Sequence, residues 1–315
     1  MEGVGVKVLL TGASGFIGSH LASLLVSSGE SVTAILKPSS VRWRIAGLES
    51  LQILECDIGD RACLQERLAR ERPDVCIHLA WHGWSGPSLT AEENLSSLAA
   101  SLELLRAVAD AGCRRFVGVG TCFEYDTAAG MLSETTPAQP NDLYGVCKHS
   151  LWMAAQALSP IAKMDVAWAR VFLVYGPFDD ERRLVPSLAL SLIRGEPART
   201  TPGEQIRDIM HVEDAASAIW AIARSSYVGA VNVASGLPVK VADVARQIAD
   251  IVGRPELLHI GALPYRASDP PVLVADTTVL RHTIGWTPRY DLTAGLTQTV
   301  AWWRAHEAAR RGVVG

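Results

Sequence analysis

Short apolar runs alternate with longer segments in which apolar residues recur at helical spacing through roughly the first 175 residues. The apolar runs fall at 6–10, 31–36, 51–55, 75–80, 116–120 and 166–174. Segments with helical spacing fall at 19–28, 61–70, 91–111 and 144–158. Such alternation is typical of strand–helix–strand units, so the pattern predicts an α/β fold built on a parallel sheet with helices on both faces.

The rhythm breaks after Pro177, where further prolines interrupt shorter segments, although an apolar run at 230–233 could return to the sheet. We therefore expect a Rossmann-type, doubly wound domain over residues 1–175, with a return of the chain near 207–235. Residues 176–315 are expected to form mainly a smaller, less regular substrate-binding domain. The cleft between the two parts is the expected substrate site.

Composition excludes several classes of function. A net charge of −4 over 315 residues argues against a nucleic-acid surface or a polybasic membrane patch. No apolar stretch approaches the length of a membrane span, and the N-terminal residues do not resemble a signal peptide. The six cysteines are scattered and have no zinc-site spacing, so no metal site is predicted and a cytoplasmic location is the simplest expectation.

A glycine-rich turn joins the first expected strand to the first expected helix. Its sequence over 11–18 is Thr-Gly-Ala-Ser-Gly-Phe-Ile-Gly. Gly12 allows a tight turn, Gly15 lets the backbone approach a pyrophosphate, and Gly18 permits close packing of helix on strand. An ordinary glycine turn is the alternative. If the turn binds a dinucleotide, its contacts should also include Ser14, Phe16 and Ile17.

The residues after the second expected strand bear on which nicotinamide cofactor is bound. An acid there usually binds the ribose hydroxyls of NAD, but this chain has none at that position. Lys37, Ser39 and Arg42 would suit the 2′-phosphate of NADP(H), which is therefore favoured, with NAD(H) still possible; alternatively they face water. Asp57 and Ile58, after the third strand, are also expected to contact the cofactor, with Asp57 at the adenine edge; Asp57 could equally be a turn residue.

Tyr144 and Lys148 are one helical turn apart and so share one helix face. A free phenol has a pKa of about 10, and a nearby ammonium should lower it, so the pair could exchange a proton with a substrate oxygen. Thr121 ends the fifth expected strand and could orient that oxygen, or it is only a strand-end threonine. With the glycine loop, these residues predict redox chemistry at a carbonyl or alcohol carbon.

Several motifs together resemble the extended short-chain dehydrogenase/reductase family, in its branch that modifies nucleotide sugars. The matching segments are the loop at 11–18, His-Leu-Ala-Trp at 78–81, Asn94, the Tyr144–Lys148 pair, 169–177 and 203–214. The resemblance implies cofactor contacts from Leu79, Ala80, Trp81 and Lys148. It also implies that Arg207 binds a substrate diphosphate, unless it only pairs with Asp208, and that the chain forms a homodimer.

Departures from the family pattern narrow the expected reaction. The family's 4,6-dehydratases carry an Asp-Glu pair after the catalytic threonine, whereas here Cys122 and Phe123 follow Thr121. Double epimerases of the family have a cysteine and a histidine, and Arg183 stands where the histidine would be. What remains is NADPH-dependent reduction of a nucleotide-linked 4-keto-6-deoxysugar. The alternatives are a 4-epimerase with tightly bound NAD and, less favoured, a non-catalytic dinucleotide sensor.

Candidate substrate contacts fall in two segments. The aromatic, glycine-containing loop after the fourth expected strand carries His82 and Trp84, which suit a sugar ring or simply cover the cofactor. Cys122 and Glu124 follow the predicted catalytic threonine. They could contact substrate, or they could be a small packing residue and part of a turn.

Overall fold

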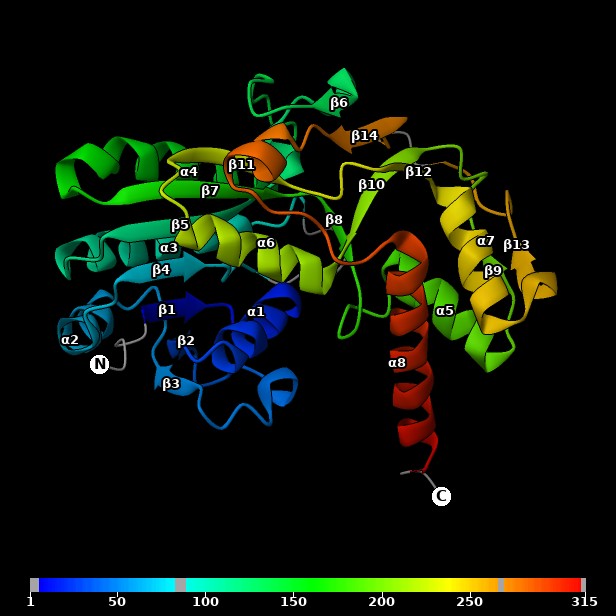
Figure 1. Cartoon of the computed structure of the whole chain (residues 1–315), viewed down its shortest axis with the longest axis horizontal. Coiled ribbons are helices and arrows are strands. Elements are labelled where there is room, and N and C mark those ends of the chain that lie inside the picture. Colours follow the sequence, from blue (N-terminus) through cyan, green and yellow to red (C-terminus); the bar gives the residue numbers. More distant parts are fainter. Residues whose placement is uncertain (1–5, 83–88, 266–268, 313–315) are drawn as a thin grey trace.

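The computed structural model describes residues 6–82, 89–265 and 269–312. Seven parallel strands form its main sheet (Figure 1). Their order across the sheet is β11 (Gly229–Val233), β7 (Asp165–Val171), β5 (Arg115–Thr121), β4 (Val75–His78), β1 (Lys7–Thr11), β2 (Ser31–Leu36) and β3 (Gln52–Glu55). The order reverses between β1 and β4, and a doubly wound sheet binds its ligand beside that point.

Helices cover both faces of this sheet because its strands are apolar on both sides. One face carries α1 (Phe16–Ser27) and α6 (Val212–Arg224), which pack on each other. The other face carries α2 (Arg61–Glu71), α3 (Glu93–Asp110) and α4 (Leu143–Ala162). The predicted Rossmann fold is confirmed, and most elements lie within a few residues of their expected positions.

The remaining elements form smaller sheets and a separate helical core, on the right of Figure 1. The second sheet has the order β12 (Pro238–Lys240), β10 (Ile206–His211), β14 (Val272–Ala275) and β6 (Met131–Leu132), and β8 (Leu173–Tyr175) also pairs with β10. The helical core contains α5 (Leu184–Arg194), α7 (Val241–Val252) and α8 (Leu292–Gly312). Beside them β9 (Ala198–Arg199) pairs with β13 (Leu258–His259).

Two local features differ from the expectation. The run at 166–174, expected as one strand, is divided: β7 lies in the main sheet, whereas β8 leaves it to pair with β10. The Phe172 amide between them still donates to Val233 O of β11, so the chain diverges only after that bond. In addition, Cys56 and Cys63 form a disulfide across the turn that follows β3, although the cysteine pattern suggested no pair.

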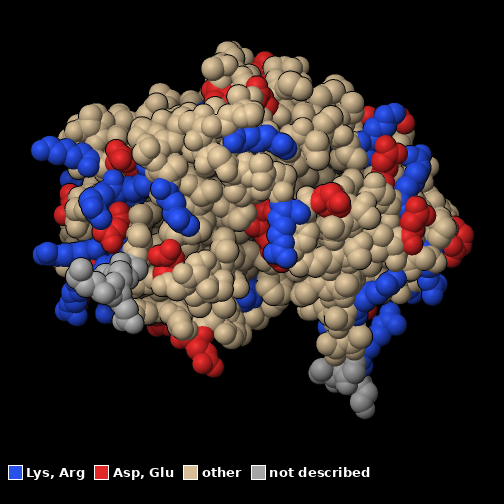
Figure 2. All heavy atoms as spheres, viewed as in Figure 1, with Lys and Arg blue, Asp and Glu red and all other residues tan. Residues whose placement is uncertain are grey.

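Figure 2 shows acidic and basic side chains interspersed over the visible face, with no broad surface of one sign there. This distribution agrees with the small net charge of the chain. Within the described ranges, no helix combines the length and apolar content that crossing a bilayer would require.

Candidate active site

The glycine loop lies where β1 and β4 diverge. Gly12 has a positive φ of 75°, and a Cβ there would lie 2.7 Å from the amide nitrogen of Ala80. A Cβ at Gly18 would lie 2.0 Å from Gly12 O. Neither position can hold a larger residue without moving backbone, so both glycines are required by the close approach of loop, helix and neighbouring strand.

A cleft of about 280 Å³ opens beside this loop. Its lining includes Gly12, Gly15, Phe16 and Ile17 from the loop and the start of α1, together with Leu79, Trp81, Thr121, Tyr144 and Lys148. Gly15 is the N-cap of α1, and no side chain caps this helix start. Backbone amides at such a start suit a pyrophosphate, so the residues present fit a nicotinamide dinucleotide.

A buried histidine ties the two strands behind the loop together. His78 Nδ1 lies 2.7 Å from Thr11 Oγ1, and His78 Nε2 lies 2.8 Å from Ser101 Oγ. Ser101 donates its own proton to Ser97 O, so we assign the Nε2 proton to the bond with Ser101. Burial lowers the pKa of His78 to about 3, which keeps the ring neutral. The sequence motif included His78 but gave no sign of this supporting role.

Tyr144 and Lys148 lie in the first turns of α4 and face the cleft. Asp142 caps the helix by accepting from the Gly145 amide at 2.7 Å, and the Tyr144 amide donates to Leu89 O at 2.9 Å. These two bonds hold the first turn in place. Lys148 Nζ lies 5.9 Å from the centre of the Tyr144 ring, so the helix brings the two predicted catalytic groups together.

Lys148 is almost fully buried and has two close neighbours. Its Nζ donates to Val119 O at 2.8 Å and lies 3.9 Å from the centre of the Trp81 ring. Burial lowers the pKa of Lys148 to about 7, and the nearby carboxylate of Glu124 acts against this by raising it. Trp81 is held in turn, because its indole donates to Asn94 Oδ1 at 2.8 Å.

The pKa of Tyr144 departs from the expectation. Burial raises it above the ordinary value of a phenol, and a hydrogen bond from Thr121 lowers it in part. The expected lowering by the Lys148 ammonium was wrong: removal of the phenolate from water dominates, and the cation that opposes it is Arg183. The phenol is protonated at neutral pH and is placed to donate a proton.

The two candidate substrate contacts after Thr121 differ in position, because only one of them lines the cleft. Cys122 lines the cleft, but burial raises the pKa of its thiol to about 12, so it is a poor base. Glu124 has no exposed surface, and its Oε1 accepts from the amide of Thr121 and from the indole of Trp168. Its carboxylate points into the protein, so the expected substrate contact is corrected to an internal role.

The residues expected at the adenine end of the cofactor are mostly exposed and already paired. Lys37 Nζ lies 3.4 Å from Asp57 Oδ2, and Arg42 pairs with Glu55. Ser39 is exposed. Ile58 instead lies buried in the hydrophobic core that it shares with α2 and α3, so the expected cofactor contact is corrected to a packing role.

Arg207 is buried and does not line this cleft; it pairs with Asp269 and donates to Ile206 O. The alternative partner Asp208 was wrong, since its carboxylate accepts from Ser235 and Gly236 instead. His82 lines the cleft, and its amide donates to Ser97 Oγ. Trp84 lies outside the described residues. Arg183, which lines the cleft, was not among the expected site residues.

Comparison with known proteins places this architecture in one family. The family model described as "NAD dependent epimerase/dehydratase family" matches residues 8–234, so the chain belongs to that family. A probable dTDP-glucose 4,6-dehydratase of Sinorhizobium fredii is 27% identical, with 95% of this chain and 93% of that protein covered.

Two solved structures are also similar over nearly their whole length. A UDP-N-acetylglucosamine 4-epimerase of Methanobrevibacter ruminantium, in complex with UDP-N-acetylmuramic acid, has a TM-score of 0.88 and 28% identity over 96% of this chain and 99% of that one. MoeE5 in complex with UDP-glucuronic acid and NAD has a TM-score of 0.82 and 30% identity over 95% and 99%. Structural neighbours thus bind NAD and nucleotide sugars.

Proposed function

We propose that this protein catalyses hydride transfer at a ring carbon of a nucleotide-linked sugar, with Tyr144 moving the proton at the same carbon's oxygen. The observation that carries the proposal is the grouping of Tyr144, Lys148 and Thr121 in one cleft with the glycine loop. The loop and the start of α1 would hold the dinucleotide, with Lys148 near its ribose. When bound, that cofactor supplies the hydride acceptor or donor. Thr121 would orient the substrate oxygen.

Elimination of water is disfavoured by the groups that follow Thr121. Cys122 carries a thiol with a raised pKa, and the Glu124 carboxylate points away from the cleft. The acid and base expected of a dehydratase are therefore not available at these positions. The likeness to dTDP-glucose dehydratases supports the family and a nucleotide-sugar substrate, but not their reaction.

Net reduction of a 4-keto-6-deoxysugar is the first candidate reaction. Burial raises the pKa of Tyr144, and a phenol that stays protonated is suited to give a proton to a carbonyl oxygen while hydride arrives. The test supplies nucleotide-linked 4-ketosugars with NADH or NADPH and follows the absorbance of the reduced cofactor. Loss of absorbance in proportion to ketosugar supports a reductase. No loss with any substrate of the panel contradicts it.

A 4-epimerase is the second candidate, and the adenine end favours it. Lys37 and Arg42 are each paired with an acid, so a 2′-phosphate would compete with Asp57 and Glu55 for them. The pairing favours NAD(H) over the NADP(H) suggested by the sequence alone. Of the two similar structures described above, one is named as a 4-epimerase and the other is a complex with NAD, and both support this candidate. Conversion of a nucleotide sugar to its 4-epimer without added cofactor would identify this reaction.

A further inference from the structure

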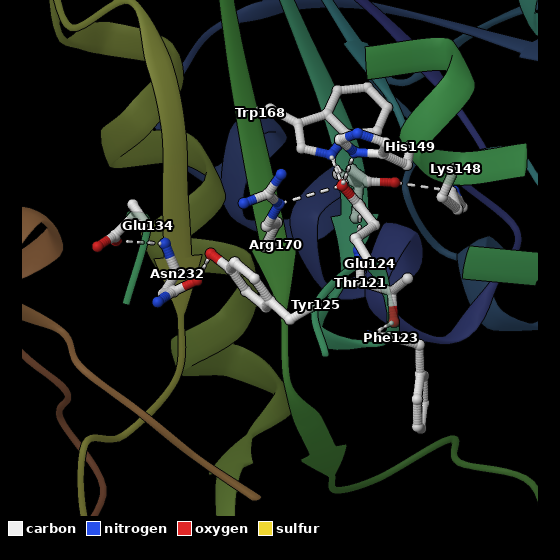
Figure 3. Close-up of polar contacts among 11 residues, drawn as sticks. Thr121, Phe123, Glu124, Tyr125, Glu134, Lys148, His149, Trp168, Arg170 and Asn232 are labelled. Atoms are coloured by element: carbon white, nitrogen blue, oxygen red, sulfur yellow. Dashed lines mark hydrogen bonds and ion pairs between the residues drawn. The ribbon is translucent and has the colours of Figure 1, made fainter. Parts of the chain in front are cut away.

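A buried carboxylate lies directly behind the predicted catalytic side chains. Glu124 ends the 3₁₀ turn η2 (Cys122–Glu124), which follows β5, and it has 0% of its surface exposed. Its Oε1 accepts from the Thr121 amide at 2.8 Å and from the Trp168 indole at 2.9 Å, and Arg170 Nε donates to Oε2 at 3.1 Å. Figure 3 shows Trp168, Arg170 and His149 converging on this carboxylate.

Strand β5 has glycines at the two positions where the Glu124 carboxylate and the Trp168 indole lie against it. A Cβ at Gly120 would lie 2.1 Å from Glu124 Oε1 and 2.2 Å from Trp168 Nε1, and one at Gly118 would lie 2.0 Å from the Trp168 ring. Residues two apart on a strand share a face, so both glycines lie under the indole and the carboxylate. Glycine weakens a strand interior, so its use twice at the sheet centre points to a group that needs the room.

The counter-charge of Glu124 is also held in place. The Arg170 guanidinium lies 4.4 Å from the centre of the Tyr125 ring, and the Tyr125 hydroxyl donates to Asn232 Oδ1 at 2.7 Å. Asn232 Nδ2 donates in turn to Leu132 O in the second sheet. These contacts hold the guanidinium in place, and through it they restrict the position of the carboxylate.

The same carboxylate acts on Lys148 through its charge. Lys148 Nζ donates to Val119 O on β5, and Glu124 accepts from the amide of Thr121 two residues further along that strand, so the amine and the carboxylate lie beside the same stretch of backbone. The titratable groups around Lys148 are Tyr144 on its own helix, His78 on β4 and Glu124 in the turn after β5. Glu124 is the carboxylate among them, and it raises the pKa of Lys148 against the effect of burial. Without that charge, the amine would lose its proton more easily.

We propose that Glu124 is a positioning residue that fixes the backbone of Thr121 and favours the charged form of the Lys148 amine. The proposal rests on the proposed function in assigning catalytic roles to Thr121 and Lys148. Its two effects are separable, because one depends on the geometry of the carboxylate and the other on its charge. Glu124→Asp keeps the charge and withdraws the oxygens, whereas Glu124→Gln keeps the length and removes the charge.

The charge effect is tested on the protein alone, without substrate. The chain has only five lysines, Lys7, Lys37, Lys148, Lys163 and Lys240, so NMR of isotope-labelled lysine can follow each amine during a pH titration. Lys148 should titrate near pH 7 in the wild type and about one unit lower in Glu124→Gln. Trp168→Phe is the matched control: it removes a neutral donor to the same carboxylate, so Lys148 should titrate as in the wild type. Equal values in the wild type and Glu124→Gln would overturn the charge effect.

The positioning effect is tested by turnover of Glu124→Asp, which also serves if Glu124→Gln fails to fold. We expect kcat to fall about 10-fold or more while dinucleotide binding and the titration of Lys148 stay as in the wild type. An unchanged kcat, or a shift in the titration of Lys148, would overturn the proposal. If no substrate of the panel is turned over by the wild type, the proposed function fails, while the NMR titration still decides the charge effect.

Discussion

The two ends of the predicted cofactor site are built in opposite ways. At the nicotinamide end, defined here by Thr121, Tyr144 and Lys148, side chains are buried or half-buried and each is held by neighbours in the sheet. At the adenine end, defined by Lys37, Arg42 and Asp57, side chains are exposed or half-buried and form surface ion pairs. Buried polar groups must be satisfied in one geometry, whereas exposed pairs can rearrange at small cost. The nicotinamide end is therefore better evidence for a functional site than the adenine end.

Tyr144→Phe should have the largest effect. It removes the proton donor but leaves the glycine loop intact, so turnover should fall more than about 100-fold while dinucleotide binding is retained. Spectrophotometric assay with an active nucleotide sugar gives the rate, and calorimetry gives the binding. A variant as fast as the wild type would remove Tyr144 from the mechanism.

A glycine-to-alanine substitution should lower the free energy of unfolding more near the nicotinamide end than near the adenine end. A Cβ at Gly120 would collide with Glu124 and Trp168, so Gly120→Ala should lower the free energy of unfolding by about 1–3 kcal/mol. Gly59, beside Asp57, has no heavy atom closer than 3.4 Å to such a Cβ, so Gly59→Ala should stay within about 0.5 kcal/mol of the wild type. Urea denaturation measures both; equal losses would show that the packing difference between the ends is not real.

The buried histidine behind the glycine loop predicts a pH effect of known sign. Burial lowers the pKa of His78 to about 3, whereas a histidine in the unfolded chain titrates near 6.5. As pH falls below about 6.5, the unfolded state takes up a proton that the folded state does not, so acid favours unfolding by up to about 1.4 kcal/mol per pH unit.

The stability advantage of the wild type over His78→Gln should therefore shrink between pH 7.5 and pH 5. Other ionisable groups titrate in both proteins and cancel in this difference. The measurement is urea denaturation of the two proteins at several pH values. A difference in free energy of unfolding that does not vary with pH would mean that His78 titrates alike in the folded and unfolded states, and an advantage that grows on acidification would mean that it is charged in the folded protein.

The smallest effect is expected at the adenine end. Replacing Asp57 by Asn and Glu55 by Gln frees Lys37 and Arg42, so NADP should gain on NAD. Exposed pairs are worth about 0.2–1 kcal/mol, which corresponds to a change of only about 1.4- to 5-fold in the ratio of the two dissociation constants. Tighter binding of NADP than NAD by the wild type would instead support the cofactor expected from the sequence alone.

Local patterns were enough to predict the fold and the family. Apolar periodicity indicated the strands and helices because it reflects which side of each segment is buried. The glycine loop and the Tyr144–Lys148 spacing act within one turn or one helix, so they can be read without knowing the rest of the chain. Family membership was likewise predicted from contiguous motifs.

The tertiary structure alone decided which side chains meet. Arg207 pairs with Asp269 rather than with its neighbour Asp208. Lys37, just after β2, pairs with Asp57, just after the neighbouring strand β3. The direction of the Glu124 carboxylate depends on Trp168 and Arg170, more than forty residues further along the chain. Sequence periodicity records burial, but it does not record which distant charges face each other. The sequence thus determined the architecture and the candidate reacting groups, and only the folded structure determined their partners and the direction of their pKa shifts.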